Sequence, residues 1–282
     1  MKTLGYYNGR YDELDRMTVP MNDRVCYFGD GVYEATLAKN YAIYCLDDHI
    51  DRLFSSMAKL EIEPPMGKEE MKKELSLMVS KMDTGELIVY WQVTRGTGVR
   101  NHVFPQEGGS NLWIALWEAH AADLSVEIAL THTEDTRFLH CDVKTLNLIP
   151  SVMASEKARR CGAHECVFHR GEIVTECAHS NVHILKNGTF ITHPADCYIL
   201  PGIARKNLIT YCKKVGIPVE ERPFTMEELY EADEVIVSSS GAFAQRATTM
   251  DGKAIGGRDG KLLAQLQQAM WADFEEQTAE KI

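Results

Sequence analysis

A single lysine stands in an apolar, β-prone stretch near the middle of the 282-residue chain. The stretch runs from Cys141 to Ile149, and strand alternation places Lys144 on the same face as Leu146 and Leu148. Burial lowers the pKa of a lysine and frees its amine as a nucleophile that can form a Schiff base. Taken alone, the stretch favours the alternative of an edge lysine whose stem reaches water.

A second candidate for chemistry is a carboxylate some thirty residues further along the chain. Glu176 ends a short Ile-Val-Thr strand and is followed by a polar turn. A carboxylate in this position can keep the nitrogen of a bound ring protonated, but a solvated strand end is the better interpretation of this segment by itself.

Three further features are suited to a phosphate group. A Pro-Gly turn after Leu200 opens a helix and leaves the amides of Ile203 and Ala204 pointing outward, where they can bind an anion. The serine-rich loop at Ser240 and Gly241 follows a strand and can form a second phosphate contact. Arg52, in an amphipathic helix, can clamp a phosphate. The alternatives are two ordinary turns and a surface arginine.

Helices and strands must position these residues. Apolar residues at helical spacing predict helices at residues 47–60, 68–82, 150–160, 202–215 and 261–274. Strand patterns occur at residues 5–7, 31–39, 42–46, 86–94, 111–117, 126–131, 165–169, 182–185, 189–192 and 234–238. Strands followed by helices in both halves predict an α+β protein of two domains with a site at their interface.

Composition is that of an ordinary soluble protein. Hydrophobic residues make up 45% and charged residues 25% of the chain, and the net charge of −11 argues against a nucleic-acid partner. The longest apolar runs have strand length, so we expect no membrane span and a cytoplasmic location. A small, polar stretch at residues 118–123 is the expected linker, which gives an N-terminal domain of residues 1–119 and a C-terminal domain of residues 120–282.

Cysteine and histidine offer a different class of function. Residues 161–169 contain Cys161, His164, Cys166 and His169, but the spacing differs from that of structural zinc sites, so we expect no metal. A Cys-His hydrolase is less well supported still, because no cysteine lies in a recognisable nucleophile turn. The cysteines are expected to be reduced, mostly buried thiols.

Five separated motifs together resemble one enzyme family. They are Asp-Arg-x-x-x-Phe-Gly-Asp-Gly-Val-Tyr-Glu at residues 23–34, His-Ile-Asp-Arg-Leu at 49–53, the Lys144 stretch, Thr-Glu-x-x-x-Ser-Asn at 175–181 and Leu-x-Gly-Ile at 200–203. In this order and spacing they are similar to the class IV aminotransferases, which are fold-type IV pyridoxal-phosphate enzymes. The resemblance covers nearly the whole chain. It implies a smaller N-terminal α/β domain and a larger, β-rich, cofactor-binding C-terminal domain, with pyridoxal 5'-phosphate at the interface.

The resemblance assigns a role to each candidate residue. It implies that Lys144 forms the internal aldimine, that Glu176 pairs with the pyridinium nitrogen, and that Leu200 packs beside the ring. The implied phosphate ligands are Arg52, the amides of Ile203 and Ala204, and Ser240 with Gly241. One departure concerns the turn after Glu176, where Cys177, Ala178 and His179 replace the Gly-Ser-x typical of D-amino-acid members.

A loop at residues 95–105 points to the substrate. It resembles the carboxylate-binding loop of D-amino-acid aminotransferases, which implies that Arg100, His102 and Tyr33 bind the substrate α-carboxylate and that the loop enters the neighbouring site of a homodimer. D-Alanine with 2-oxoglutarate is an implied substrate pair. A branched-chain L-amino-acid aminotransferase, an aminodeoxychorismate lyase, and a cofactor-binding protein without turnover remain alternatives, and without the family match a surface turn is an equal interpretation of the loop.

Overall fold

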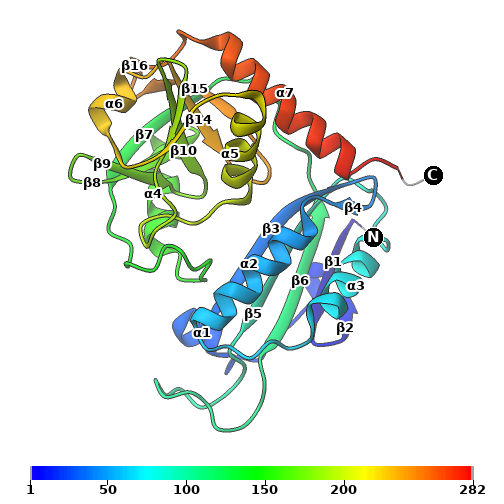
Figure 1. Cartoon of the computed structure of the whole chain (residues 1–282). Helices are drawn as coiled ribbons and strands as arrows, with labels where there is room; N and C mark the ends of the chain where they lie inside the picture. The colour runs from blue at the N-terminus through cyan, green and yellow to red at the C-terminus, as the bar shows by residue number, and fades with distance from the viewer. Residues whose placement is uncertain (1, 281–282) are drawn as a thin grey trace. The chain divides into compact units, whose positions relative to one another are not determined.

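The computed structural model describes residues 2–280, and the chain divides into two compact units that are each built on one sheet (Figure 1). Unit 1 comprises Met1–His120, Val143–Asn147 and Phe274–Ile282, and unit 2 comprises Ala121–Asp142 and Leu148–Asp273. The mixed content of helices and strands confirms the predicted α+β class.

Unit 1 contains a six-stranded antiparallel sheet in the order β2-β1-β6-β5-β3-β4. Its strands are β1 (Thr3–Tyr7), β2 (Arg10–Asp12), β3 (Gly31–Lys39), β4 (Ala42–Ile43), β5 (Leu87–Thr94) and β6 (Asn111–Glu118). In the middle of the sheet every second residue of β5 is fully buried, including Val89, Trp91 and Val93. The strand therefore presents one apolar face to a core and the opposite face, with Tyr90 and Gln92, to the candidate site.

Helices α2 (Leu46–Lys59) and α3 (Lys68–Val79) supply the core residues that pack against this sheet. Unit 1 also contains α1 (Arg24–Phe28) and a 3-10 turn at Leu14–Arg16. The predicted periodicity of α2 places Ile50, Leu53 and Met57 fully inside the core. Asp47 and Asp48, in the first turn of α2, interact favourably with the positive end of the helix dipole.

Unit 2 contains the larger, mixed sheet, in the order β12-β11-β10-β14-β15-β7-β8-β9-β13 with β16 paired to β15. Its strands are β7 (Ile128–Glu134), β8 (Glu165–Arg170), β9 (Ile173–Cys177), β10 (Asn181–Lys186), β11 (Thr189–Thr192), β12 (Val219–Glu221), β13 (Phe224–Thr225), β14 (Glu234–Ser238), β15 (Gln245–Met250) and β16 (Lys253–Ala254). Its helices are α4 (Ile149–Arg160), α5 (Ile203–Val215), α6 (Met226–Tyr230) and α7 (Gly260–Gln277), the last of which ends in residues assigned to unit 1.

The Lys144 stretch differs from its predicted form. The prediction of an alternating strand from Cys141 to Ile149 is wrong. The segment is irregular and makes one isolated β-bridge, between Thr145 and Val32 of β3. Backbone hydrogen bonds from Tyr33 to Lys144 and from Leu146 to Gly31, at 2.9 and 3.0 Å, bind the segment to unit 1. None of the described helices is long and apolar enough to cross a membrane.

Candidate functional site

In unit 1, Lys144 is fixed against strand β3. Its carbonyl accepts from the Tyr33 amide, its own amide donates to Ser56 Oγ at 3.3 Å, and its Nζ lies 4.3 Å from the centre of the Tyr33 ring. The side chain is half-buried, and the neighbouring Val143 belongs to the hydrophobic core. Lys144 therefore does not lie on the edge of a strand, and its amine is held over an aromatic face.

Tyr33 belongs to a short row of polar side chains on the same face of the sheet. Its ring stacks on that of Tyr90 with the centres 5.6 Å apart, and the Tyr90 hydroxyl donates to Gln92 Oε1 at 2.7 Å. Burial, together with the nearby Tyr33, raises the pKa of Tyr90. Tyr90 therefore stays a neutral hydrogen-bond donor, and the row gives the Lys144 amine a rigid aromatic support.

Arg52 is not the surface arginine that its helix position allowed. Its Nε and one terminal nitrogen each lie 2.7 Å from a carboxylate oxygen of Glu34, and His49 Nδ1 lies 2.7 Å from Glu34 Oε2. Glu34 is completely buried. Burial opposes its ionisation, but Arg52 and His49 outweigh that effect and lower the pKa of Glu34 to about 2. The carboxylate thus fixes the Arg52 guanidinium in a bidentate pair.

Arg100 and His102 lie in the exposed loop between β5 and β6 and share one aromatic neighbour. The Arg100 guanidinium is 5.3 Å from the centre of the Phe28 ring, and the His102 and Phe28 rings are 5.2 Å apart. Tyr33, the third residue expected in this group, lies instead against Lys144.

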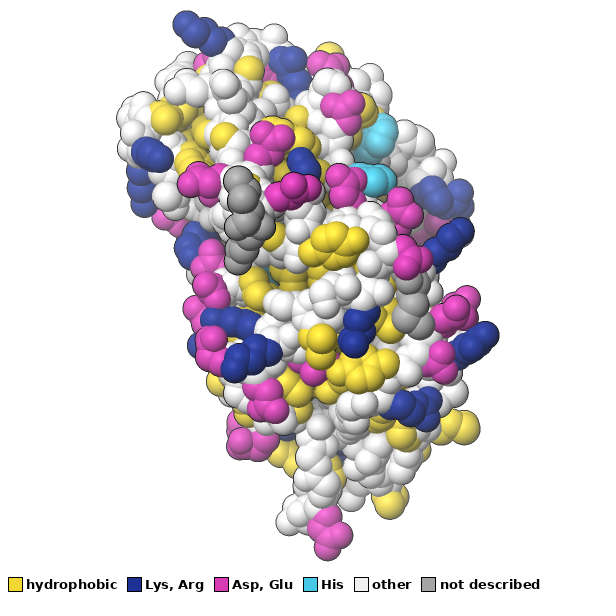
Figure 2. Space-filling model, turned by 90° about the vertical axis from the view of Figure 1, so that its right-hand side faces the viewer, with side chains coloured by type: hydrophobic (Ala, Val, Ile, Leu, Met, Phe, Trp, Pro, Cys, Tyr) yellow, Lys and Arg dark blue, Asp and Glu magenta, His cyan; other side chains and the backbone are white. Residues whose placement is uncertain are grey.

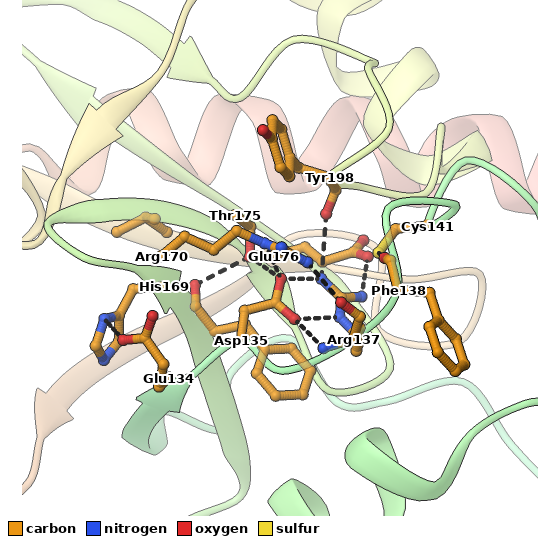
Figure 3. A network of polar contacts seen from close by, with 12 residues as sticks. Glu134, Asp135, Arg137, Phe138, Cys141, His169, Arg170, Thr175, Glu176 and Tyr198 are labelled. Atoms are coloured by element: carbon orange, nitrogen blue, oxygen red, sulfur yellow. Dashed lines mark hydrogen bonds and ion pairs between the residues drawn. The ribbon is translucent and has the colours of Figure 1, made fainter.

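In unit 2, Glu176 is buried and accepts several hydrogen bonds, of which Figure 3 shows the contact with Arg137. Arg137 donates to Oε1 at 2.5 Å, and Oε2 accepts from the Asn181 side chain at 2.9 Å and from the Leu200 amide at 3.0 Å. Glu176 is 5% exposed, so the interpretation as a solvated strand end is wrong. Three donors from three segments favour the ionised carboxylate and fix its direction.

Sequence reasoning missed Arg137, which the structure places at the centre of this network. Its Nε and a terminal nitrogen lie 2.9 Å from the two oxygens of Asp135, and the Arg170 Nε lies 3.2 Å from the same carboxylate. Burial opposes ionisation of Asp135, but Arg137 lowers its pKa. The sequence Asp-Thr-Arg at residues 135–137 shows no helical or strand periodicity. The two opposite charges, two residues apart, were the one feature of the sequence that could have indicated this pair.

Two of the segments expected to bind phosphate, the start of α5 and the loop of Ser240 and Gly241, are joined inside unit 2 by a buried chain of hydrogen bonds. Arg205, next to Ile203 and Ala204 in the first turn of α5, donates to Thr192 Oγ1 at 3.2 Å. His183 lies 2.8 Å from Thr192 Oγ1 through Nδ1 and 2.8 Å from Ser238 Oγ through Nε2. Ser238 precedes Ser239, whose hydroxyl accepts from the Gly241 and Ala242 amides around Ser240. We call this the Arg205–Ser238 chain.

Gly202, which caps α5, is required by close packing. A Cβ at this position would lie 2.0 Å from Asn181 Oδ1, so only glycine lets the Glu176 network and the helix start approach each other.

The cysteine and histidine cluster does not come together as a metal site. Among residues 2–280, no three His, Cys, Asp or Glu side chains are arranged so that they could hold a metal ion. His179, in the unusual turn after Glu176, pairs with Glu165 at 3.0 Å, and Ser180 donates to the same carboxylate at 2.7 Å. Burial raises the pKa of the Cys177 thiol well above its ordinary value, so this cysteine is a protonated core residue.

Known proteins match the chain over most of its length. A model of the family described as amino-transferase class IV matches residues 31–249. The D-alanine aminotransferase of Listeria monocytogenes serotype 1/2a (strain 10403S) is 42% identical over 276 residues, covering 95% of this chain and 94% of that protein. The D-alanine aminotransferase of Bacillus licheniformis is 34% identical over 288 residues, covering 100% of both chains.

Solved structures share the fold. The branched-chain amino acid aminotransferase of Escherichia coli superposes with a TM-score of 0.88 at 22% identity, covering 99% of this chain and 96% of that one. A second branched-chain enzyme, from T.th. and complexed with N-(5'-phosphopyridoxyl)-L-glutamate, gives a TM-score of 0.86 at 21% identity, with 99% and 95% covered.

Proposed function

The chain belongs to the class IV aminotransferases, and we propose that it transfers the amino group of a D-amino acid such as D-alanine to a 2-oxo acid such as 2-oxoglutarate. The observation that carries this conclusion is the similarity to D-alanine aminotransferases over nearly the whole chain, at 42% and 34% identity. The branched-chain enzymes are similar at 21% and 22% identity, which extends to the fold alone.

The enzyme is pyridoxal-phosphate dependent, and its residues fit that cofactor. Glu176 is a buried carboxylate whose donors favour its charged form, as pairing with a protonated ring nitrogen requires. Lys144 offers an amine fixed by its backbone and by the Tyr33 ring. When bound, pyridoxal phosphate supplies an electron sink that stabilises the negative charge left on the substrate Cα after loss of its proton.

We propose one role for each predicted residue. Lys144 would hold the cofactor covalently, and its Nζ, once displaced by the substrate amine, would be the free base that moves the proton of the substrate Cα. Glu176 keeps the ring nitrogen protonated, and Leu200 packs beside the ring while its amide holds Glu176. The proposed phosphate ligands are Arg52, the amides of Ile203 and Ala204, and Ser240 with Gly241, supported by the anion-binding character of a helix N-terminus and of arginine.

Arg100, His102 and Tyr33 are the proposed ligands of the substrate α-carboxylate. The two loop residues are exposed, and they lie between Val99 and Val103, which are 88% and 65% exposed. Apolar side chains at such a loop tip suit a protein partner, in keeping with a homodimer in which the loop at 95–105 reaches the neighbouring site. We further propose that the enzyme acts in the cytoplasm.

The reaction and its stereochemistry are tested together. Purified enzyme given D-alanine and 2-oxoglutarate is expected to form pyruvate, and its visible absorption band is expected to shift when D-alanine is added alone. L-Leucine in place of D-alanine is the matched control. Turnover of L-leucine without turnover of D-alanine would support the branched-chain alternative, and a Lys144→Ala variant that behaves like wild type would overturn the cofactor assignment.

The carboxylate assignment has its own test. Arg100→Ala is expected to raise KM for D-alanine at least about tenfold while the cofactor stays bound, because a bidentate guanidinium contact is lost. The measurement is steady-state kinetics beside the absorption spectrum. An unchanged KM would remove Arg100 from the substrate site.

A further inference from the structure

The segment at residues 22–30 holds the first residues of the loop at 95–105. The Arg24 amide donates to the Gly96 carbonyl at 2.9 Å, the Gly98 amide donates to the Asn22 carbonyl at 3.0 Å, and the Arg95 amide donates to the Asp30 carbonyl at 3.0 Å. The Arg95 Nε lies 2.9 Å from Asp30 Oδ2. The start of the loop is therefore fixed by residues 22–30, most of which belong to the first of the five family motifs.

Arg24 also reaches the tip of the loop. One terminal nitrogen of its guanidinium donates to the Asn101 carbonyl at 2.7 Å and to the Val103 carbonyl at 3.3 Å. These carbonyls lie on either side of His102, and the first directly follows Arg100. The position of both proposed carboxylate ligands is thus tied to the Arg24 side chain.

The Arg24 guanidinium is itself held rigidly. It is 3% exposed, its Nε donates to Asp30 Oδ2 at 2.7 Å, and it lies 4.9 Å from the centre of the Phe28 ring. Phe28 is also the ring against which Arg100 and His102 lie. A buried, paired guanidinium with a planar set of donors can hold two carbonyls in a fixed place, which a flexible ammonium cannot.

We propose that Arg24 is a positioning residue that holds the loop at 95–105 in the conformation that presents Arg100 and His102 to the substrate carboxylate. The proposal rests on the proposed function, since it assumes that Arg100 and His102 bind the substrate. Arg24 does not touch the substrate, so its effect is on substrate binding and is separate from cofactor binding.

The test uses the holoenzyme and the substitution Arg24→Lys, which keeps the charge beside Asp30 but loses the fixed fork of donors. We expect KM for D-alanine to rise about tenfold with little change in kcat or in the cofactor absorption band, since small displacements of a binding group weaken substrate binding. Trypsin is expected to cleave faster after Arg100, because the loop tip is released. Arg24→Met is the more severe variant and should extend both effects.

Arg246→Lys is the matched control. Arg246 pairs with the buried Glu234 in unit 2 and makes none of the loop contacts, so its replacement should leave KM and the cleavage after Arg100 unchanged. An unchanged KM for D-alanine together with unchanged trypsin cleavage after Arg100 in Arg24→Lys would overturn the proposal. Weaker cofactor binding in Arg24→Lys with an unchanged KM for D-alanine would also overturn it. If Arg100→Ala itself leaves KM for D-alanine unchanged, the carboxylate assignment fails instead. Faster trypsin cleavage in Arg24→Lys would still show that Arg24 holds the loop at 95–105.

Discussion

The carboxylate of Glu176 depends on side chains that are distant in the sequence. Arg137 precedes it by 39 positions and the Leu200 amide follows it by 24, and both lie within hydrogen-bond distance of its oxygens. Because Arg137 also holds Asp135, removal of this one cation leaves two buried carboxylates without their main counter-charge. A buried charge without a partner is far more costly than the pair itself is stabilising.

We therefore expect Arg137→Met to lower the free energy of unfolding by about 3–5 kcal/mol. Urea unfolding at pH 7 measures the change. Arg159→Met is the matched control, because Arg159 pairs with Glu156 on the surface of α4 and is 73% exposed, and its loss should cost less than about 1 kcal/mol. Equal effects of the two substitutions would contradict the importance of the buried network.

At the scale of elements, the Arg205–Ser238 chain links distant strands to a helix. The Arg205 guanidinium can only donate, so Thr192 Oγ1 accepts from it. Burial, with Arg205 nearby, lowers the pKa of His183 well below its ordinary value, so the ring is neutral and one of its nitrogens donates while the other accepts. The chain thus runs from α5 through β11 and β10 to the end of β14.

Ser238→Ala tests the importance of this chain. The substitution leaves the buried Nε2 of His183 without its hydrogen-bond partner, which should cost about 1–3 kcal/mol in the free energy of unfolding. Because the chain joins α5 to the loop of Ser240 and Gly241, affinity for pyridoxal phosphate should fall as well, as measured by titration of the apoenzyme. Thr210→Val is the control, since Thr210 lies on an exposed part of α5. Full cofactor affinity in Ser238→Ala would show that the chain serves stability alone.

At the scale of the whole molecule, charge is distributed differently on the surface and inside. Acidic and basic side chains are interspersed on the face shown in Figure 2, while the net charge is −11. Each unit also encloses a carboxylate paired with arginine, Glu34 in unit 1 and Asp135 in unit 2. Such local cations allow a protein of negative net charge to bind small anions.

These buried carboxylates predict the response to acid. The folded-state pKa of Glu34 is about 2 against an ordinary 4.5, so its contribution is complete above pH 4.5 and is lost as the pH falls toward 2. The loss should be on the order of 3 kcal/mol for Glu34, with a further loss in the same direction from Asp135, whose pKa is also lowered. Urea unfolding at pH 7, 5, 4 and 3, in wild type and in Glu34→Gln, measures this. The variant should be less stable at pH 7 and should show a shallower fall, and an equally steep fall would contradict the assignment to Glu34.

The sequence determined the local elements of the fold. Most predicted helices and strands agree with the structure to within a few residues, as for α5, because apolar spacing and the Gly216 stop are local signals. Short elements such as α1 and β2 were missed, since they carry too few residues for a period. The family and its class of reaction also followed from the sequence, because the order and spacing of the five motifs are properties of the chain itself.

Tertiary structure alone decided how the site residues are held. The strand expected around Lys144 is replaced by an irregular segment bonded to β3, since pairing with a distant strand outweighs local strand propensity. Arg137 and Arg24 gave no periodic signal, and their importance comes from partners such as Glu176 and the Asn101 carbonyl that are brought near only by folding. The types and spacing of residues therefore fixed the chemistry, whereas burial and long-range hydrogen bonds decided which charges are paired and where they point.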